Sequence, residues 1–378
     1  MAKLGELGKI ITGNTPKTSD AQNYRSNDIC FVKPSDFTDN EITEIHQSEF
    51  YISEYAKDKA RVLPTDSILV TCIGIIGKVA INKVPCAFNQ QINAIIPERK
   101  ICDPRYVAYA IQNVQPQMQN TANAAVVPIL NKTQFSNIEI PLPSLEMQKQ
   151  IVEFLDKVTS LISLRKQQLA KLDELVKARF VEMFGDISNS RKVPMQDVCK
   201  IITDGTHQPP KFVLSGIPFL FVSNIVTNEI HYDAEKFISE ETYNELIKRT
   251  PIEVGDVLLS TVGSYGHPAV VKENKPFCFQ RHIAYLKPNN SVVNSEYLRC
   301  AILSTDLQRQ IDESVKGIAQ KTLNLSEIRK LRLPLPSLSL QNQFAAFVER
   351  VDQQKQTVQQ SLEKLELMKK ALMQEYFG

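Results

Sequence analysis

The chain has 378 residues, of which 43% are hydrophobic and 23% are charged, and its formal net charge is +2. This length and composition predict a globular protein with room for two domains, and the near-zero charge argues against a protein that holds DNA alone through a large basic surface. No apolar run reaches the roughly 20 residues that cross a bilayer, and the N-terminus lacks the apolar core of a signal peptide, so we expect a cytoplasmic protein without membrane contact.

The first predicted domain covers residues 1–139. Short β-branched runs broken by Gly, Pro and Asn predict a mixed domain with several short strands and turns. Its recognisable marks are the run Lys-Ile-Ile-Thr at 9–12, the polar segment Gly-Asn-Thr-Pro-Lys at 13–17, Asp-Ser-Ile-Leu-Val-Thr at 66–71, Gly-Ile-Ile-Gly at 74–77 and Phe-Asn-Gln-Gln at 88–91.

A long amphipathic helix is predicted within residues 140–185. The segment opens with Pro-Leu-Pro-Ser-Leu, and Ser144 is placed to accept hydrogen bonds from the free amides of the first turn. A heptad-like apolar stripe continues for about 36 residues, or roughly 54 Å at ~1.5 Å per residue. The stripe contains Ile151, Phe154, Val158, Leu161, Leu172 and Leu175, with Arg165 and Arg179 as polar interruptions.

The second predicted domain, residues 186–332, repeats the marks of the first. The two domains also share a tyrosine that begins a helical pattern and a Leu-Asn pair before the long helix. The repeated marks are Lys-Ile-Ile-Thr at 200–203, Asp-Gly-Thr-His-Gln at 204–208, Asp-Val-Leu-Leu-Ser-Thr at 256–261, Gly-Ser-Tyr-Gly at 263–266, Phe-Gln-Arg-His at 279–282, Tyr106 with Tyr297, and Leu130-Asn131 with Leu323-Asn324. Because the two domains share a framework and differ in their loops, we expect them to bind different ligands of the same kind.

The final segment, residues 333–378, aligns without a gap to residues 140–185 at a constant offset of 193. Its apolar stripe contains Phe344, Phe347, Val351, Val358, Leu365 and Met368, interrupted at Gln354, and Ser337 occupies the position of Ser144. Each helix must bury its stripe, either on its own domain or against the other helix. We favour pairing of the two helices, antiparallel because a twofold relates them, as a rigid spacer. The predicted fold is therefore α+β (mixed α/β), with two similar globular domains separated by two long antiparallel coiled-coil helices and an internal pseudo-twofold.

Signatures of catalysis are weak. Asp103-Pro104-Arg105-Tyr106 lacks the second proline of the DNA methyltransferase loop and is typical of a helix start. Gly74 to Val79 has the wrong spacing for a nucleotide-binding loop, and Glu273-Asn274-Lys275 is a chance-level match to a nuclease motif. Seven scattered cysteines without a Cys-x-x-Cys pair, and five scattered histidines, predict reduced thiols and no metal site. We therefore expect a protein without catalytic activity or a cofactor of its own.

Polar loops in equivalent places of both domains are the candidate ligand contacts. Asn and Gln side chains can make two hydrogen bonds to adenine, and Arg can make two to guanine, in the major groove of DNA. Such residues also cap turns and bond local backbone, and for any single one that alternative is about as strong. As a group they predict a DNA interface that contains Gly13, Asn14, Thr15, Lys17, Lys78, Gln90, Gln91, Thr206, His207, Gln208, Tyr265, Gln280 and Arg281.

Over essentially its whole length the chain resembles the specificity subunits of type I restriction–modification systems. The resemblance lies in Pro-Leu-Pro-Ser-Leu-x-x-Gln-x-Gln at the start of each helix, Phe-Gly at its end, Thr-Gly-Asn-Thr-Pro at 12–16, and the duplication. The loop at 204–208 departs from this pattern, because it lacks the Thr-Pro pair. The resemblance implies two target recognition domains that each read one part of a split, asymmetric double-stranded DNA site. The paired helices would fix the unread gap.

The same resemblance implies partners. Two methyltransferase subunits would dock on the helices, restriction (translocase) subunits would join them, and S-adenosylmethionine, ATP and Mg²⁺ would belong to those partners. The docking residues expected on the helix starts are Gln148, Ile151, Phe154, Gln341, Phe344 and Phe347. The alternatives are a coiled-coil scaffold whose domains bind proteins or glycans, and a self-contained methyltransferase or nuclease.

Overall fold

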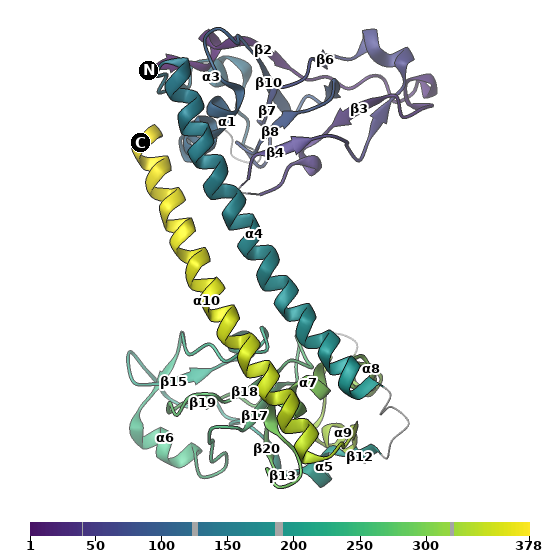
Figure 1. The fold of residues 1–378 in the computed structure, drawn as a ribbon, viewed down its shortest axis with the longest axis vertical. Helices are drawn as coiled ribbons and strands as arrows, with labels where there is room; N and C mark the ends of the chain where they lie inside the picture. The colour runs from purple at the N-terminus through teal and green to yellow at the C-terminus, as the bar shows by residue number, and fades with distance from the viewer. Residues whose placement is uncertain (40, 123–127, 186–191, 318–320) are drawn as a thin grey trace. The chain divides into compact units, whose positions relative to one another are not determined.

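The structure is a computed structural model that describes the whole chain except residues 40, 123–127, 186–191 and 318–320. The chain divides into two compact units (Figure 1). Unit 1 comprises Met1–Lys166 with Gln360–Gly378, and unit 2 comprises Gln167–Gln359. Each unit therefore contains one globular domain, part of its own long helix, and part of the long helix that follows the other domain.

Unit 1 contains two main sheets and the pair β1–β11. The larger sheet has the order β2-β10-β7-β8-β4, and the smaller has the order β5-β3-β9-β6. The strands are β1 (Ala2–Lys3), β2 (Gly8–Thr12), β3 (Ile29–Val32), β4 (Thr43–Ile45), β5 (Tyr51–Ile52), β6 (Val62–Leu63), β7 (Ile68–Thr71), β8 (Val79–Asn82), β9 (Cys86–Phe88), β10 (Ile92–Pro97) and β11 (Glu139–Ile140). The helices are η1 (Leu4–Glu6), η2 (Ala21–Tyr24), η3 (Pro34–Asp36), η4 (Glu54–Lys59), α1 (Pro104–Asn113), α2 (Gln115–Thr121), α3 (Lys132–Ser136) and the start of α4 (Leu145–Phe184).

Unit 2 repeats this arrangement. Its larger sheet has the order β13-β20-β17-β18, its smaller sheet β14-β16-β15-β19, and β12 pairs with β21. The strands are β12 (Lys192–Pro194), β13 (Cys199–Asp204), β14 (Phe212–Val213), β15 (Ile217–Leu220), β16 (Phe237–Ile238), β17 (Val257–Ser260), β18 (Pro268–Val270), β19 (Cys278–Phe279), β20 (Ile283–Pro288) and β21 (Arg332–Pro334). The helices are α5 (Met195–Val198), η6 (Val222–Asn224), α6 (Glu240–Leu246), α7 (Ser295–Leu303), α8 (Thr305–Ser314), α9 (Leu325–Lys330) and the start of α10 (Leu338–Phe377).

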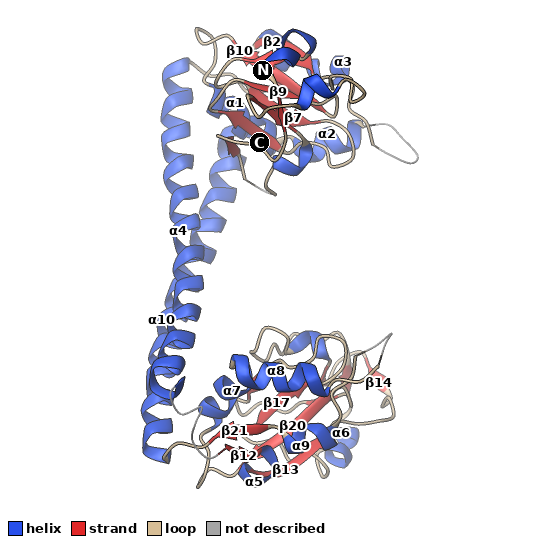
Figure 2. Ribbon diagram, turned by 90° about the vertical axis from the view of Figure 1, so that its right-hand side faces the viewer, coloured by secondary structure: helices blue, strands red, loops and turns tan. Residues whose placement is uncertain are grey.

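The main core of each unit lies between its larger sheet and the helix that begins at the repeated tyrosine. In unit 2, α7 and α8 lie along one face of the sheet (Figure 2), where Tyr297 and Ala301 pack with Val257 and Leu286. Polar residues cap the N-termini of both helices: Asp103 accepts hydrogen bonds from the first amides of α1, and Asn294 from those of α7. The predicted mixed α/β class and the internal repeat are confirmed.

The long helices are longer than expected. Both contain 40 residues, which at ~1.5 Å per residue is about 60 Å. Ser144 and Ser337 cap them through their hydroxyl oxygens, as the sequence predicts. Within unit 1 the start of α4 lies antiparallel to the end of α10, and Arg165 donates to Ser361 across the pair. Within unit 2, Leu172 packs with Val351 and Val358.

The predicted apolar stripe is wrong at several positions. Phe154, Leu161, Leu175 and Met368 are 56%, 43%, 46% and 51% exposed. The buried seam of α4 instead runs through Ile151, Leu155, Val158, Ile162 and Leu172, and that of α10 through Phe344, Val348, Val351, Val358 and Leu362. The true spacing alternates four and three residues from Ile151, whereas the predicted stripe mixed this face with the adjacent one. Both alternatives for burial are realised, because each helix packs on its own domain near its start and against the other helix farther on.

Candidate nucleic-acid interface

A turn between β9 and β10 forms the centre of the candidate interface in unit 1. The amide of Ile92 donates to the carbonyl of Asn89 at 3.2 Å, which closes a β-turn with Gln90 and Gln91 as its central residues. Three further backbone hydrogen bonds hold it: Asn89 N to Val32 O (3.1 Å), Cys72 N to Gln91 O (2.8 Å) and Gly13 N to Ile92 O (3.0 Å). The backbone of this turn is thus held by three different segments of the unit.

The turn between β19 and β20 repeats this geometry in unit 2. Ile283 N donates to Gln280 O at 3.1 Å, so Arg281 and His282 are the central residues. The supporting bonds recur as Gln280 N to Leu220 O (3.2 Å), Thr261 N to His282 O (2.9 Å) and Gly205 N to Ile283 O (3.2 Å). Residues 89–92 and 280–283 are therefore equivalent, and Arg281 stands where unit 1 has Gln90.

A second segment, which we call the glycine loop, lies against each turn: residues 13–17 in unit 1 and 205–208 in unit 2. Asn14 N donates to Phe88 O at 3.0 Å, and Thr206 N donates to Phe279 O at 3.1 Å. A Cβ on Gly13 would lie 2.1 Å from the carbonyl oxygen of Asn89, and one on Gly205 would lie 2.2 Å from that of Phe279. Only glycine allows this approach, so both glycines shape the interface and offer no side chain to a ligand.

Side chains of the glycine loop orient the turn residues in unit 1. Thr15 Oγ1 donates to Gln90 Oε1 at 2.7 Å, and both residues are exposed. Asn14 is held by Lys59 and Arg61, since its amide donates to Lys59 O (2.8 Å) and its Oδ1 accepts from Arg61 N (2.9 Å). Arg61 also donates through its guanidinium to the carbonyl of Thr12.

Unit 2 places a charged cluster at the corresponding loop. Arg249 and His207 both contact Asp204, His207 Nε2 at 3.0 Å from its carboxylate. On the turn, Arg281 Nε lies 3.4 Å from His282 Nε2. Burial and the neighbouring Arg281 lower the pKa of His282, so its imidazole is neutral at pH 7 and can accept this hydrogen bond.

Arg61 and Arg249 were not among the residues predicted from the sequence. Arg61 lies seven residues before β7 and Arg249 lies eight residues before β17, and each contacts the glycine loop of its own unit. The signal that could have found them is an exposed arginine in the same region of both halves. Their distances from these equivalent strands differ by one residue, which hides the correspondence.

Four predicted residues have local partners that change their interpretation. Lys78 pairs with Asp39 at 2.6 Å, and its side chain is only 13% exposed, so it is not a free cation for DNA. Tyr265 donates to Asp312 at 3.0 Å. Gln91 accepts from the side chain of Asn89 at 2.8 Å, and Thr206 donates from its hydroxyl to the carbonyl of Gln208 at 3.0 Å. Lys17, His207 and Gln208 lie exposed at the glycine loops.

The predicted docking residues of the helix starts need correction. Gln148, Ile151, Gln341 and Phe344 are 0%, 4%, 0% and 0% exposed, so a partner cannot contact them on the folded chain. The two glutamines have a structural role instead. Gln148 accepts from Asp103 N at 2.9 Å and donates to two carbonyl oxygens, and Gln341 does the same with Asn294 N at 2.8 Å. They tie the start of each long helix to the segment before α1 or α7.

The other two docking residues differ in exposure. Phe154 is 56% exposed. Phe347 is partly buried, with the guanidinium carbon of Arg179 5.8 Å from the centre of its ring. Of the six, Phe154 alone is predominantly exposed.

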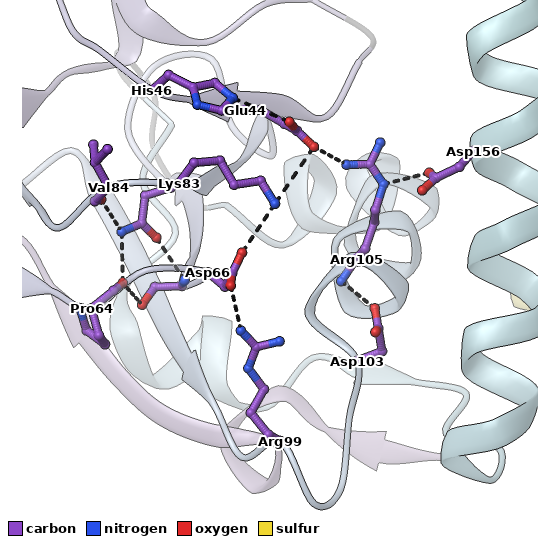
Figure 3. A network of polar contacts seen from close by, with 12 residues as sticks. Glu44, His46, Pro64, Asp66, Lys83, Val84, Arg99, Asp103, Arg105 and Asp156 are labelled. Carbon is purple, nitrogen blue, oxygen red and sulfur yellow. Dashed lines mark hydrogen bonds and ion pairs between the residues drawn. The ribbon is translucent and has the colours of Figure 1, made fainter.

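An ion-pair network fixes α4 to the domain of unit 1 (Figure 3). Arg105 on α1 contacts Asp156 on α4 and Glu44 on β4, both at 2.6 Å. Lys83, which follows β8, lies 3.8 Å from Glu44 and 3.2 Å from Asp66. Partly buried pairs that share members hold geometry better than isolated surface pairs.

Unit 2 makes the equivalent attachment with other residues. Lys272, which follows β18, pairs with Asp352 on α10 at 2.5 Å and lies 3.6 Å from Glu296 on α7. Arg299 pairs with Glu296 at 2.7 Å. Each long helix is thus fixed at its start to its own domain.

Cys72 and Cys102 are buried free cysteines of unit 1. Burial raises the pKa of Cys72 and Cys102 to about 11, so these thiols stay protonated and are poor nucleophiles at neutral pH. Within the described ranges no three His, Cys, Asp or Glu side chains gather as metal ligands do. Nor does any helix among those residues have the length and apolar character to cross a membrane.

Comparison with known proteins gives one family. Residues 1–174 and 188–367 match the type I restriction modification DNA specificity domain. The chain is 24% identical over 372 residues to the type I restriction enzyme MjaIX specificity subunit of Methanocaldococcus jannaschii, covering 92% of this chain and 85% of that one. It is 22% identical over 297 residues to the EcoBI specificity subunit of Escherichia coli, covering 71% of this chain and 62% of that one.

Two solved structures share the fold. One is the crystal structure of the type I restriction-modification system S subunit from M. genitalium, with a TM-score of 0.57 at 14% identity, covering all of this chain and 95% of that one. The other belongs to a study of complex assembly and conformational transition of the type I R-M system, with a TM-score of 0.60 at 17% identity, covering 99% and 96%.

Proposed function

The chain belongs to the family of type I restriction modification DNA specificity domains, and on that premise we propose that it is the subunit that reads a two-part DNA sequence without catalysing a reaction itself. The observation that carries this proposal is the repeated interface. Both units hold a β-turn and a glycine loop with the same backbone hydrogen bonds, and they differ in the side chains that these segments display. A constant backbone with variable polar side chains suits two recognition surfaces for two different sequences.

The near-neutral charge fits a subunit that contributes base contacts within a larger assembly. Contacts to phosphates supply most of the affinity of DNA-binding proteins, whereas contacts to base edges supply the sequence preference. A net charge of +2 over 378 residues leaves the first task largely to other subunits. We assign to those subunits, two methyltransferases and the restriction subunits, the binding of S-adenosylmethionine, ATP and Mg²⁺, in the cytoplasm.

Methylation mapping tests this function. Cells that express the chain with its methyltransferase subunits should methylate one split, asymmetric motif with an unread gap. The chain without those subunits should methylate nothing. A continuous palindromic motif, or methylation that does not depend on sequence, would contradict the proposal, as would methylation by the isolated chain.

Exposed apolar residues of the long helices are the surface that we propose for docking of the methyltransferase subunits. Leu161, Leu164 and Leu367 are 43%, 58% and 69% exposed within unit 1. Burying the exposed part of these side chains at an interface is favourable by about 25 cal/mol for each Å² of apolar surface. The double substitution Leu161→Asp and Leu164→Asp should abolish co-purification with the methyltransferase subunit. The matched change at the exposed polar residues Ser160 and Gln167 should leave it intact.

The helices also set the unread gap in this proposal. The two units meet in sequence at Lys166–Gln167 on α4 and at Gln359–Gln360 on α10. Inserting one heptad at each junction keeps the seam in phase and lengthens the helices by about 10.5 Å. Because one base pair advances about 3.4 Å, the gap in the methylated motif should widen by about three base pairs. An unchanged gap would show that the helices do not set it.

A further inference from the structure

The first central residue of the repeated turn is Gln90 in unit 1 and Arg281 in unit 2, and we call this the reading position. Each is the second residue of a four-residue β-turn, and both side chains are exposed. In both units the backbone around the reading position is held by the same hydrogen bonds from three segments. None of those bonds uses the side chain of the reading position, so the residue there can change without loss of the turn.

Each reading side chain is fixed at one atom by a neighbour. In unit 1 the hydroxyl of Thr15 donates to Gln90 Oε1 at 2.7 Å, which orients the amide. In unit 2 the Nε of Arg281 lies 3.4 Å from the neutral His282 Nε2, which orients the guanidinium. Fixing one atom lowers the conformational entropy that a long side chain loses when it binds. It is an arrangement suited to recognition rather than to a solvated surface.

The two side chains favour different bases. An amide that presents an acceptor and a donor side by side matches N6 and N7 of adenine, whereas a guanidinium matches O6 and N7 of guanine. We propose that Gln90 selects an A·T pair in the half-site read by unit 1, and that Arg281 selects a G·C pair in the half-site read by unit 2. This assignment rests on the proposed function, because it presupposes that the turns face DNA.

Thr15 and His282 act as positioning residues in this assignment. Neither has to touch a base, since each holds the side chain that does. Thr15→Val removes the hydroxyl with little change in volume, and His282→Leu removes the acceptor for Arg281. Each change should weaken the preference at one base pair severalfold without changing which base is preferred. A purely structural role would instead lower methylation of all sequences together.

The test uses the chain assembled with its methyltransferase subunits and a DNA library in which both half-sites are randomised, with methylated molecules identified by sequencing. Gln90→Arg should convert one position of the first half-site from A·T to G·C and leave the second half-site unchanged. Arg281→Gln should do the converse. The preference at the altered position should change by about 5- to 150-fold, the range for one good two-bond contact to a base.

The half-site that is not altered serves as the internal control for folding and assembly, because methylation of the library requires both units. Lys17→Ala provides a matched control at the glycine loop: an exposed cation that contacts phosphates should lower methylation of all sequences uniformly and reduce the salt dependence.

If Gln90→Arg and Arg281→Gln lower methylation without changing either motif, the reading position is not specificity-determining and the assignment fails, while the two-part function stands. If the unaltered complex shows no split motif, the proposed function itself fails.

Discussion

Each long helix ends with Phe-Gly, and its phenylalanine packs into the core of the other domain, not of the domain that directly precedes the helix in sequence. Phe377, at the end of α10, is 5% exposed in unit 1, with its ring 5.2 Å from that of Tyr106. Phe184, at the end of α4, is 3% exposed in unit 2, with its ring 4.9 Å from Tyr297 and 5.4 Å from Phe344. Truncating each phenylalanine to alanine should therefore destabilise one unit and spare the other.

The structure also predicts which truncation costs more. Loss of a buried phenylalanine costs about 3–5 kcal/mol. Phe184 makes two ring contacts with other helices, and Phe377 makes one. One additional aromatic pair is worth about 0.5–1.5 kcal/mol. Phe184→Ala should therefore lower the free energy of opening of its unit by about this amount more than Phe377→Ala does. This difference corresponds to an equilibrium constant for opening that is roughly 2- to 13-fold larger.

Hydrogen exchange of the native protein measures the two units separately. Phe184→Ala should speed exchange of the amides of α7, and Phe377→Ala those of α1. Controls are Val181→Ala and Leu367→Ala, three and ten residues before the two phenylalanines, whose side chains are 64% and 69% exposed. The reasoning is refuted if each truncation affects both units equally, or if Phe377→Ala is the costlier change.

Three further predictions concern stability, each measured by urea unfolding. Gln148→Ala leaves a buried amide and two carbonyl oxygens without hydrogen-bond partners and should lower the free energy of unfolding by about 2–4 kcal/mol. Gln150→Ala, at an exposed position, should lower it by less than about 0.5 kcal/mol. Equal losses would contradict the structural role of Gln148. Gly205→Ala should cost more than Gly263→Ala, because the first Cβ would meet a carbonyl oxygen at 2.2 Å and the second only a φ of +71°; the reverse order would contradict the close approach. Burial raises the pKa of Asp256, so the stability that this carboxyl contributes is present below its unfolded pKa of about 3.9 and is lost as the pH rises through its folded pKa. Asp256→Asn should therefore become more stable relative to the unaltered protein as the pH rises from 4 to 7. A difference in unfolding free energy that stays constant over this range would refute the prediction.

The duplication and the long helices could be predicted because their signals are local and repeated. Pro-Leu-Pro-Ser-Leu and Phe-Gly bound each helix, and the constant offset of 193 residues shows the repeat without any knowledge of the fold. The phase of the buried seam could not be fixed this way. Phe154 and Leu155 are both apolar, and only the packing shows that Leu155, which is 0% exposed, faces the core.

Alignment of the repeated motifs places one pair of equivalent strands in the globular domains one residue out of register. Aligning the segments at 66–71 and 256–261 equates Thr71 with Thr261. The strand pairings show otherwise, since Ile92 pairs with Thr71 while its equivalent, Ile283, pairs with Ser260. A shift of one residue reverses the face of every side chain in a strand. Sequence similarity in a short β-branched run is too weak to set that register.

The sequence predicts the types of residue at the interface, but only some of their positions. The turn at 89–92 was found because both halves preserve a phenylalanine before it. Arg61 and Arg249 were missed because they approach the glycine loop from about 45 residues away along the chain, a separation that no local pattern encodes. Lys78 belongs to the predicted group, but its partner Asp39 lies 39 residues earlier, a separation that the local sequence does not reveal.

The difference between backbone contacts and displayed side chains explains how one scaffold can recognise two different sequences. Backbone hydrogen bonds hold both turns and both glycine loops, so their geometry depends on glycine at 13 and 205 and on strand pairing, and not on the side chain at the reading position. Substituting Gln90 or Arg281 leaves those bonds in place, whereas substituting Gly13 or Gly205 does not. Changes in specificity should therefore be tolerated at the reading position and not at the glycines. A specificity change at position 90 that also unfolded unit 1 would show that recognition and scaffold are not separable in this protein.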